Sequence, residues 1–481
     1  MRGHFIGGEE ALSPSFQEWH IKRATDDEVI AKFAQGNPAD VEPALKAALA
    51  GFEQWQHFSP SEQEACFLEA SNQVAKASCD LRELIIDETG STITKANFEV
   101  GYTSQLLRAA AGEVRRLYGE TIPADKPNRR SQVIRQPLGV VGVISPFNAP
   151  LALLAKMTAF PVAAGNAVII KPSEWASMVA WEFTRLLCKS GFPPGLINTL
   201  FGKGPEVGEA IVKNPQIDAI TFTGSTNTGV AISHGASPHV KRLHLELGGN
   251  NAVIVCPDFP LDLAARKTCY GAFFHGGQIC MASRRVLVHE DIYGDFCNKL
   301  VHQAEDLTLG DLRNPKTAYG PLINQLAVQK VHKHMESALK SGGELLTGGE
   351  LVGNRTLSPV VISQPSSDCE AWQEETFGPL CLVKSFRTKE EALELANQTR
   401  YGLSAGVMTY DLRLADYFSR NLKVGAVHIG SHSFHSEAMA PLGGEGHSGL
   451  GRSGGKYSIE AFVQQKWIST EIDPGPFPEG Y

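Results

Sequence analysis

Hydrophobic residues recur at helical spacing through most of the first third of the chain. The pattern predicts helices over 40–55, 60–86 and 94–117. From residue 132 the hydrophobic pattern changes, and short β-branched apolar runs alternate with helical stretches. Strands are predicted at 139–144, 167–170, 197–201 and 219–222, and helices at 151–164, 181–190 and 205–213. This alternation predicts a parallel sheet with right-handed crossovers and helices on its faces.

A second alternation begins after Gly248, with strands predicted at 251–255, 285–288 and 381–386. The chain of 481 residues is too long for one ordinary core, so a second α/β domain is expected there. A basic, extended stretch at 127–137 interrupts the first domain.

Composition excludes several classes of function. With 42% hydrophobic and 20% charged residues, the chain has the make-up of a soluble globular protein. A net charge of −8 argues against a nucleic-acid or anionic-membrane partner. There is no apolar run of membrane-spanning length, and residues 1–8 lack the apolar core of a signal peptide. The nine scattered cysteines form no Cys-x-x-Cys pair, which favours a reducing, cytoplasmic location over a disulfide framework or zinc ribbon.

Three short runs carry candidate chemistry. Cys280 ends the Gly-rich run Phe-His-Gly-Gly-Gln-Ile-Cys, Glu246 lies in an otherwise apolar strand over 243–247, and Asn148 lies in Ser-Pro-Phe-Asn-Ala-Pro. They supply a thiol nucleophile, a carboxylate base and an amide donor for an oxyanion. That set suits chemistry on a carbonyl carbon.

In these runs, and through nearly the whole chain, the sequence resembles the aldehyde dehydrogenase superfamily. The resemblance implies an α/β fold with a Rossmann-type NAD-binding domain (1–118 and 138–248) and a catalytic domain (249–448). Residues 119–137 and 449–481 would form a small β oligomerisation arm and a C-terminal tail, in which 127–137 pairs with 463–470. The Pro-rich end at 474–478 would be a surface strap. A homodimer or homotetramer is expected.

The dinucleotide site is expected where strands end and helices begin. The candidates are Gly204 and Gly208 in one Gly-rich turn, and Phe222, Gly224 and Ser225 in another, whose hydroxyl would cap the next helix. The resemblance adds further residues: Lys171, Ser173, Glu174, Leu247, Glu375 and Phe377. A carboxylate at Glu174 would accept ribose hydroxyls and repel a 2′-phosphate, so NAD is favoured and NADP is the alternative.

The resemblance implies that Cys280 attacks an aldehyde, Asn148 stabilises the oxyanion and Glu246 activates water to hydrolyse the thioester. An intact Glu246 favours a free acid over the coenzyme A thioester of an acylating semialdehyde dehydrogenase. The presence of Cys280, Glu246 and Asn148 together argues against a non-enzymatic protein on this scaffold.

Within the family, the sequence most resembles the vanillin, benzaldehyde and salicylaldehyde dehydrogenases, which favours an aromatic aldehyde as substrate. The candidate pocket residues are Phe147, Phe274, Met281, His432 and Phe434. Serines and histidines in 428–437 leave a sugar-derived or hydroxylated aldehyde as an alternative substrate, and no metal site is expected.

Some positions depart from the family pattern: His275 and Gly430 stand where Asn is common, Leu442 stands where Phe is common, and Gly446 stands where Lys is common.

Overall fold

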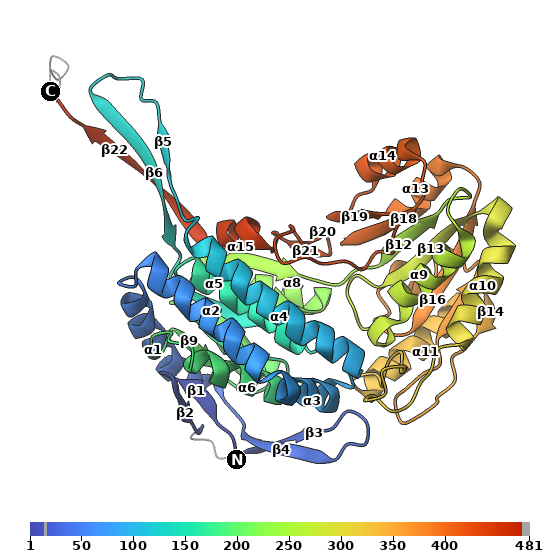
Figure 1. The fold of residues 1–481 in the computed structure, drawn as a ribbon, viewed down its shortest axis with the longest axis horizontal. Helices are drawn as coiled ribbons and strands as arrows, with labels where there is room; N and C mark the ends of the chain where they lie inside the picture. Colours follow the sequence, from blue (N-terminus) through green and yellow to red (C-terminus); the bar gives the residue numbers. More distant parts are fainter. Residues whose placement is uncertain (14–16, 474–481) are drawn as a thin grey trace.

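The computed structural model describes residues 1–13 and 17–473, so the predicted strap at 474–478 lies outside the described residues. Two large sheets dominate the molecule (Figure 1). The first has eight strands in the order β2 (Glu9–Ala11), β1 (His4–Ile6), β9 (Ile197–Thr199), β8 (Ala167–Lys171), β7 (Val140–Ile144), β10 (Ala219–Thr223), β11 (Arg242–Glu246) and β21 (Gly449–Leu450).

The predicted parallel core is confirmed for β9-β8-β7-β10-β11, whose neighbours all pair in parallel. The edge strands β1, β2 and β21 pair antiparallel, which the pattern did not predict. The helices of this half are α1 (Val41–Trp55), α2 (Pro60–Lys76), α3 (Ser78–Thr89), α4 (Ile93–Val114), α5 (Pro150–Ala163), α6 (Ser177–Cys188), α7 (Glu209–Lys213) and α8 (Thr226–Ala236).

Two helical predictions were wrong in detail. The expected helix over 60–86 is broken at Ala77, where ψ rises to 12° and α3 restarts. No Gly or Pro marks this break in the sequence. The expected helix over 205–213 opens with a π-helical turn over Gly204–Gly208 before α7 begins. A π-helical turn widens the backbone, and such turns are frequent at functional sites.

The second sheet has seven strands, all parallel except β14 at one edge. Their order is β14 (Glu344–Thr347), β15 (Val360–Ser363), β16 (Leu380–Phe386), β13 (Ser283–His289), β12 (Asn251–Val255), β18 (Ser404–Met408) and β19 (Ala426–Ile429). Its helices are α9 (Leu261–Phe273), α10 (Tyr293–Glu305), α11 (Gln325–Lys340), α12 (Glu370–Gln373), α13 (Lys389–Asn397) and α14 (Leu412–Asn421).

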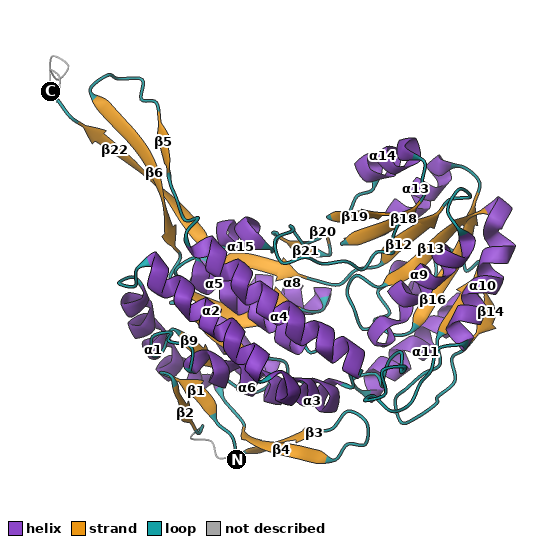
Figure 2. Cartoon of the chain, in the orientation of Figure 1, coloured by secondary structure: helices purple, strands orange, loops and turns teal. Residues whose placement is uncertain are grey.

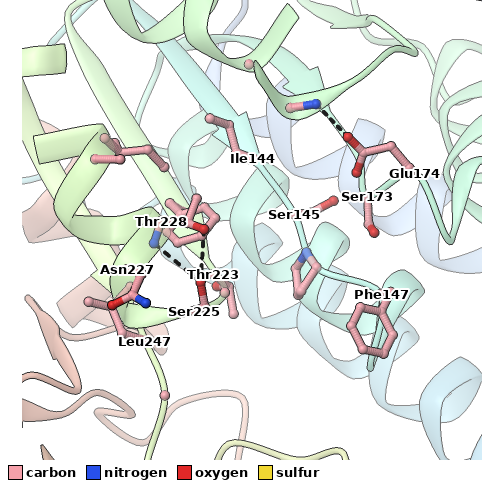
Figure 3. Close-up of a pocket in the computed structure, with 18 of the residues that line it drawn as sticks. Ile144, Ser145, Phe147, Ser173, Glu174, Thr223, Ser225, Asn227, Thr228 and Leu247 are labelled. Atoms are coloured by element: carbon pink, nitrogen blue, oxygen red, sulfur yellow. Dashed lines mark hydrogen bonds between the residues drawn. The ribbon is translucent and has the colours of Figure 1, made fainter. Parts of the chain in front are cut away.

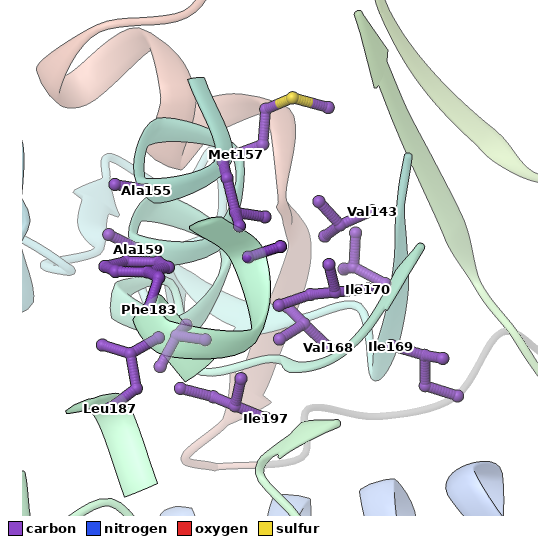
Figure 4. Packing of buried hydrophobic residues seen from close by; sticks show 14 of the residues in the cluster. Val143, Ala155, Met157, Ala159, Val168, Ile169, Ile170, Phe183, Leu187 and Ile197 are labelled. Atoms are coloured by element: carbon purple, nitrogen blue, oxygen red, sulfur yellow. The ribbon is translucent and has the colours of Figure 1, made fainter. Parts of the chain in front are cut away.

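Both sheets are buried on their two faces, as parallel sheets are. In β12, Ala252 and Ile254 join one hydrophobic cluster while Val253 and Val255 join another, because successive side chains alternate. In the first sheet, Val168 and Ile170 of β8 point toward α5 and α6, and Ile169 points away (Figure 4).

The basic stretch supplies the middle strand of a three-stranded arm that projects from the body (Figure 2). Its strands are β22 (Val463–Glu471), β6 (Arg129–Pro137) and β5 (Glu120–Ile122). The predicted pairing of 127–137 with the C-terminal segment is confirmed, with Val463 opposite Pro137. The short helix α15 (Gly455–Ala461), just before β22, packs on α4 and α5.

Two small antiparallel pairs complete the fold: β3 (Glu18–Lys22) with β4 (Val29–Ala34), and β17 (Tyr401–Gly402) with β20 (Glu445–Gly446). In the described ranges, no helix combines the length and the hydropathy needed to cross a membrane.

Candidate active site

A cavity of about 1160 Å³ opens at the carboxyl ends of the first sheet. The chain runs from β7 to β8 and β9 on one side, then crosses back to β10 and β11 on the other. Ligands of open α/β sheets bind at such a reversal of strand order. Ile144 and Thr223, the last residues of β7 and β10, both line the cavity (Figure 3).

The eleven residues predicted to bind a dinucleotide all line this one cavity. They come from the ends of three strands, from the Gly-rich turn that follows β9 and from the loop that precedes β16. The parallel topology brings strand ends that are far apart in sequence to one edge. The set is Lys171, Ser173, Glu174, Gly204, Gly208, Phe222, Gly224, Ser225, Leu247, Glu375 and Phe377.

Lys171 and Glu174 form an ion pair on the cavity wall, with Nζ and Oε1 2.9 Å apart. The same Glu174 oxygen accepts a hydrogen bond from the backbone N–H of Gly204. Lys171 is almost fully buried, and burial lowers the pKa of its ammonium group while Glu174 opposes that shift. The pair ties the end of β8 to the turn at Gly204, and both groups face the cavity.

The helix α8 points its N-terminus at the same cavity. Ser225 is its N-cap and accepts a hydrogen bond at Oγ from the Thr228 N–H at 3.3 Å. Ser225 and Gly224 line the cavity beside the free N–H groups of the first turn. A helix N-terminus opening into a cavity suits a phosphate group.

Glu375 is held by the turn that follows β11. Its Oε1 accepts the backbone N–H of Gly249 at 3.0 Å, and burial raises the pKa of its carboxyl group. A Cβ at Gly248 would lie 2.4 Å from Glu375 Oε2, and one at Gly249 would lie 2.5 Å from the carbonyl oxygen of Cys280. The glycine pair therefore lets Glu375 and the Cys280 backbone approach this turn from two sides.

Cys280 follows a loop with three successive left-handed residues, His275, Gly276 and Gly277, at φ 54°, 60° and 67°. Gln278 anchors the loop: its Nε2 donates to the His275 carbonyl, and its Oε1 accepts the Ile323 N–H at 2.9 Å. Asn148 Nδ2 donates to the Gln278 carbonyl at 3.0 Å. Asn148 and Cys280 both line the cavity, so the structure brings the predicted amide donor and thiol together.

The Cys280 thiol is half-buried at the cavity wall. Burial raises the pKa of this thiol to about 12, and the nearby carboxylates of Glu246 and Glu375 add to the rise. Because the side chain borders an open cavity, water there offsets part of the desolvation. The resting side chain is therefore a neutral thiol, and it needs a base in order to react.

Glu246 ends β11 and is buried behind the cavity wall. Its Oε1 accepts a hydrogen bond from Ser453 Oγ at 2.5 Å and lies 3.9 Å from His244 Nε2. Lys156 of α5 is also buried, and its Nζ has no hydrogen-bond partner in the described structure; burial lowers the pKa of its ammonium group, and the Glu246 charge opposes that shift. The sequence reasoning missed all three neighbours, although a single Lys within the apolar run of α5 was a visible signal.

The remaining predicted pocket residues lie elsewhere around Cys280. Phe147 lines the cavity and packs edge-on against Phe377, with ring centroids 6.1 Å apart. Phe274, His432 and Phe434 form an aromatic group with Tyr270, which the sequence analysis missed; the Phe274–Phe434 centroids are 5.5 Å apart. Phe434 packs with Met281 and Cys280 in a small apolar cluster. Apart from Phe147, this pocket set does not line the large cavity.

Three departures from the family pattern have backbone explanations. His275, Gly430 and Gly446 all have left-handed φ angles, of 54°, 68° and 57°. Gly adopts this conformation most readily, and Asn and His adopt it more readily than most other residues, so all three residues suit the backbone at their positions. His275 is buried with Nε2 unpartnered in the described structure.

Comparison with known proteins identifies the relatives of this chain. Residues 13–468 match the family model described as Aldehyde dehydrogenase family. The chain is 36% identical to the benzaldehyde dehydrogenase [NAD(+)] of Pseudomonas putida, over 92% of this chain and 91% of that protein. It is 34% identical to a mitochondrial succinate-semialdehyde dehydrogenase of Arabidopsis thaliana, over 96% and 88%. A crystal structure of Staphylococcus aureus betaine aldehyde dehydrogenase in complex with NAD+ superposes with a TM-score of 0.97 at 30% identity, covering 100% of this chain and 97% of that one.

Proposed function

Because the chain belongs to the aldehyde dehydrogenase family, with the predicted fold, we propose that it oxidises an aldehyde to a free carboxylic acid using NAD. The observation that carries this proposal is the placement of Cys280 and Asn148 on the wall of the cavity that all eleven predicted dinucleotide residues line. The relatives include NAD-dependent and NAD-bound proteins.

The cavity fits a dinucleotide by its own chemistry. Ser225 and the α8 N-terminus suit a pyrophosphate, Glu174 and Lys171 suit the hydroxyls of one ribose, and Glu375 suits the other ribose. Phe377 would pack beside the nicotinamide. When bound, NAD supplies the hydride acceptor.

The chain's own residues carry the other steps. Cys280 loses its proton to water in the cavity, and the thiolate adds to the aldehyde carbon. Asn148 Nδ2 and the Cys280 N–H stabilise the oxyanion. After hydride departs, the carbon is held as a thioester on Cys280. Glu246 then takes a proton from water, the hydroxide adds to the thioester, and the C–S bond breaks to release the acid and the thiol.

Replacing the nucleophile tests this function. Cys280→Ala should abolish NADH formation from aldehydes, whereas Cys79→Ala, at an exposed site far along the chain, should retain it. In Glu246→Gln, mass spectrometry should find an acyl group on the peptide that contains Cys280. NADH production by Cys280→Ala would refute the proposal. Coenzyme A-dependent product formation would favour an acylating enzyme instead.

Glu174 supports NAD over NADP. A 2′-phosphate near this carboxylate would meet a repulsion of about 1 kcal/mol in water-like surroundings, which is about fivefold in kcat/KM. Glu174→Gln should therefore raise the NADP-to-NAD ratio of kcat/KM about fivefold. A wild-type enzyme that prefers NADP would overturn the preference.

We favour an aromatic aldehyde as substrate, because Tyr270 and Phe274 pack with Phe434, and Phe434 and Cys280 pack against the same small apolar cluster. A pair of aromatic rings contributes about 0.5–1.5 kcal/mol beyond burial. Phe434→Ala should thus lower kcat/KM for benzaldehyde about two- to twelvefold more than for acetaldehyde. Equal losses on both would exclude ring stacking, and a wild-type preference for sugar aldehydes would favour the hydroxylated class.

We also propose a cytoplasmic homo-oligomer. The nine cysteines are free thiols, which suits a reducing compartment. The arm exposes Trp467 and Ile122, at 68% and 43% of their surface, and such side chains suit contact with a second copy. Light scattering on wild type and on a Trp467→Glu variant tests this; a monomeric wild type would exclude it.

A further inference from the structure

Arg284 lies four residues after Cys280, at the second position of β13, and only 3% of its surface is exposed. Its two terminal nitrogens donate to different loops: Nη2 to the Gly277 carbonyl, and Nη1 to the Gly378 carbonyl. Gly277 belongs to the loop that ends at Cys280. Gly378 directly follows Phe377 in the loop that carries Glu375. One guanidinium thus bridges the nucleophile loop and the cofactor loop.

The two loops meet closely at this bridge. Both are in the left-handed region there, with φ of 67° at Gly277 and 55° at Phe377. A Cβ at Gly277 would lie 2.3 Å from the Gly378 carbonyl oxygen and 2.8 Å from Arg284 Nη1. Neither loop can shift at this point without moving the other or breaking the bridge.

The charge of Arg284 is buried without a paired carboxylate. Among the described residues, no acid lies within ion-pair distance of it, and its Nε has no hydrogen-bond partner. Burial lowers the pKa of the guanidinium to about 10, while the charge of Glu375 opposes that shift. The group therefore stays protonated at neutral pH.

The adjacent Arg285 provides a contrast. It is equally buried, but all three of its donor nitrogens bind carbonyls within the second domain: those of Asn250, Leu395 and Ala396. Its bonds fix elements around β12 and α13 and reach neither loop. Adjacent arginines in one strand therefore have different roles.

We propose that Arg284 is a positioning residue that couples occupancy of the cofactor site to the order of the nucleophile loop. This inference rests on the proposed function, since Glu375 and Phe377 must be cofactor contacts for the coupling to act. A cofactor that fixes the loop at 375–378 then fixes Gly277 through the guanidinium, and with it the backbone that presents Cys280.

Hydrogen exchange read by mass spectrometry, with and without saturating NAD+, tests the coupling. In the wild type, NAD+ should slow exchange at 204–208 and 224–228, and also at 275–280. In Arg284→Met the slowing at 275–280 should be lost while that at 204–208 and 224–228 remains, and kcat should fall at least tenfold. Arg285→Lys, the matched control, should keep the slowing at 275–280 and the wild-type kcat.

Gly277→Ala provides a second route if Arg284→Met fails to fold, because its Cβ would separate the same two loops with the arginine intact. It should lose the slowing at 275–280 as well. Equal slowing at 275–280 in wild type and both variants would overturn the inference. Wild type that shows slowing at 204–208 but none at 275–280 would also overturn it. If NAD+ slows exchange at none of these segments in the wild type, the proposed cofactor site is refuted instead.

Discussion

The high pKa of Cys280 makes the free enzyme's thiol slow to alkylate. A rise from 9.0 to about 12 is three pKa units, or about 4 kcal/mol against the thiolate at 1.36 kcal/mol per unit. At pH 8 the thiolate fraction falls from about 0.1 to about 0.0001. Since the thiolate is the nucleophile, alkylation should be up to about a thousandfold slower than for an unperturbed thiol. Water in the cavity makes this an upper limit.

The assay follows iodoacetamide labelling of Cys280 between pH 7 and 10 in cofactor-free protein, peptide by peptide. The exposed Cys79 serves as an internal reference for reagent access. Labelling of Cys280 should rise about tenfold per pH unit without a plateau. Glu246→Gln should label faster at each pH, because one of the carboxylates that raise the pKa of the thiol is gone. A plateau below pH 9 would refute the reasoning, since the thiol would then already be ionised.

Three further predictions concern buried carboxylates. Glu246→Gln should give a stopped-flow burst of NADH followed by slow turnover, because hydride transfer precedes hydrolysis; a uniformly slow trace would contradict the assigned step. Ser453→Ala removes a hydrogen bond to Glu246 worth about 1.5–3 kcal/mol, so kcat should fall about ten- to a hundredfold while Ser453→Thr retains activity; an unchanged kcat would exclude a role for the hydroxyl. Burial raises the pKa of Glu88 from 4.5 to about 7, so folding is favoured while this group is protonated, and about 3 kcal/mol is lost as pH rises from 4.5 through 7. The melting temperature of Glu88→Gln minus that of wild type should therefore be higher at pH 8 than at pH 5. A difference that does not change with pH would contradict this prediction.

The sequence predicted best those site residues that the parallel topology of the sheet brings together. Gly204, Ser225 and Glu174 were predicted from strand-to-helix turns alone or with the resemblance, and parallel strands bring such turns to one edge. The pairing of 127–137 with 463–470 also followed from the resemblance. The break at Ala77 could not be predicted, because no Gly or Pro marks it; it lies between α2 and α3, which both pack on α4.

Side-chain partners were harder to predict than site residues. Ser453 reaches Glu246 across 207 positions of sequence, because β21 returns antiparallel beside β11 and the chain then turns back over it. That edge strand has two residues and no apolar pattern. Tyr270 joined the aromatic group only because α9 places it one turn before Phe274.

The first sheet contributes its carboxyl ends to the active site, and the second sheet contributes its amino ends. Lys171, Thr223 and Leu247 lie at the carboxyl ends of the first sheet, whereas Cys280 and Glu375 precede β13 and β16 at the amino ends of the second. A ligand held by the first edge therefore faces groups supplied by the second. Hydride transfer needs the nucleophile and the acceptor in one fixed geometry, yet each belongs to a different edge. The turn at 247–250 links the two edges through the Gly249–Glu375 hydrogen bond, and the Arg284 bridge holds together the two loops of the second edge. Perturbing either contact should therefore impair catalysis more than dinucleotide binding.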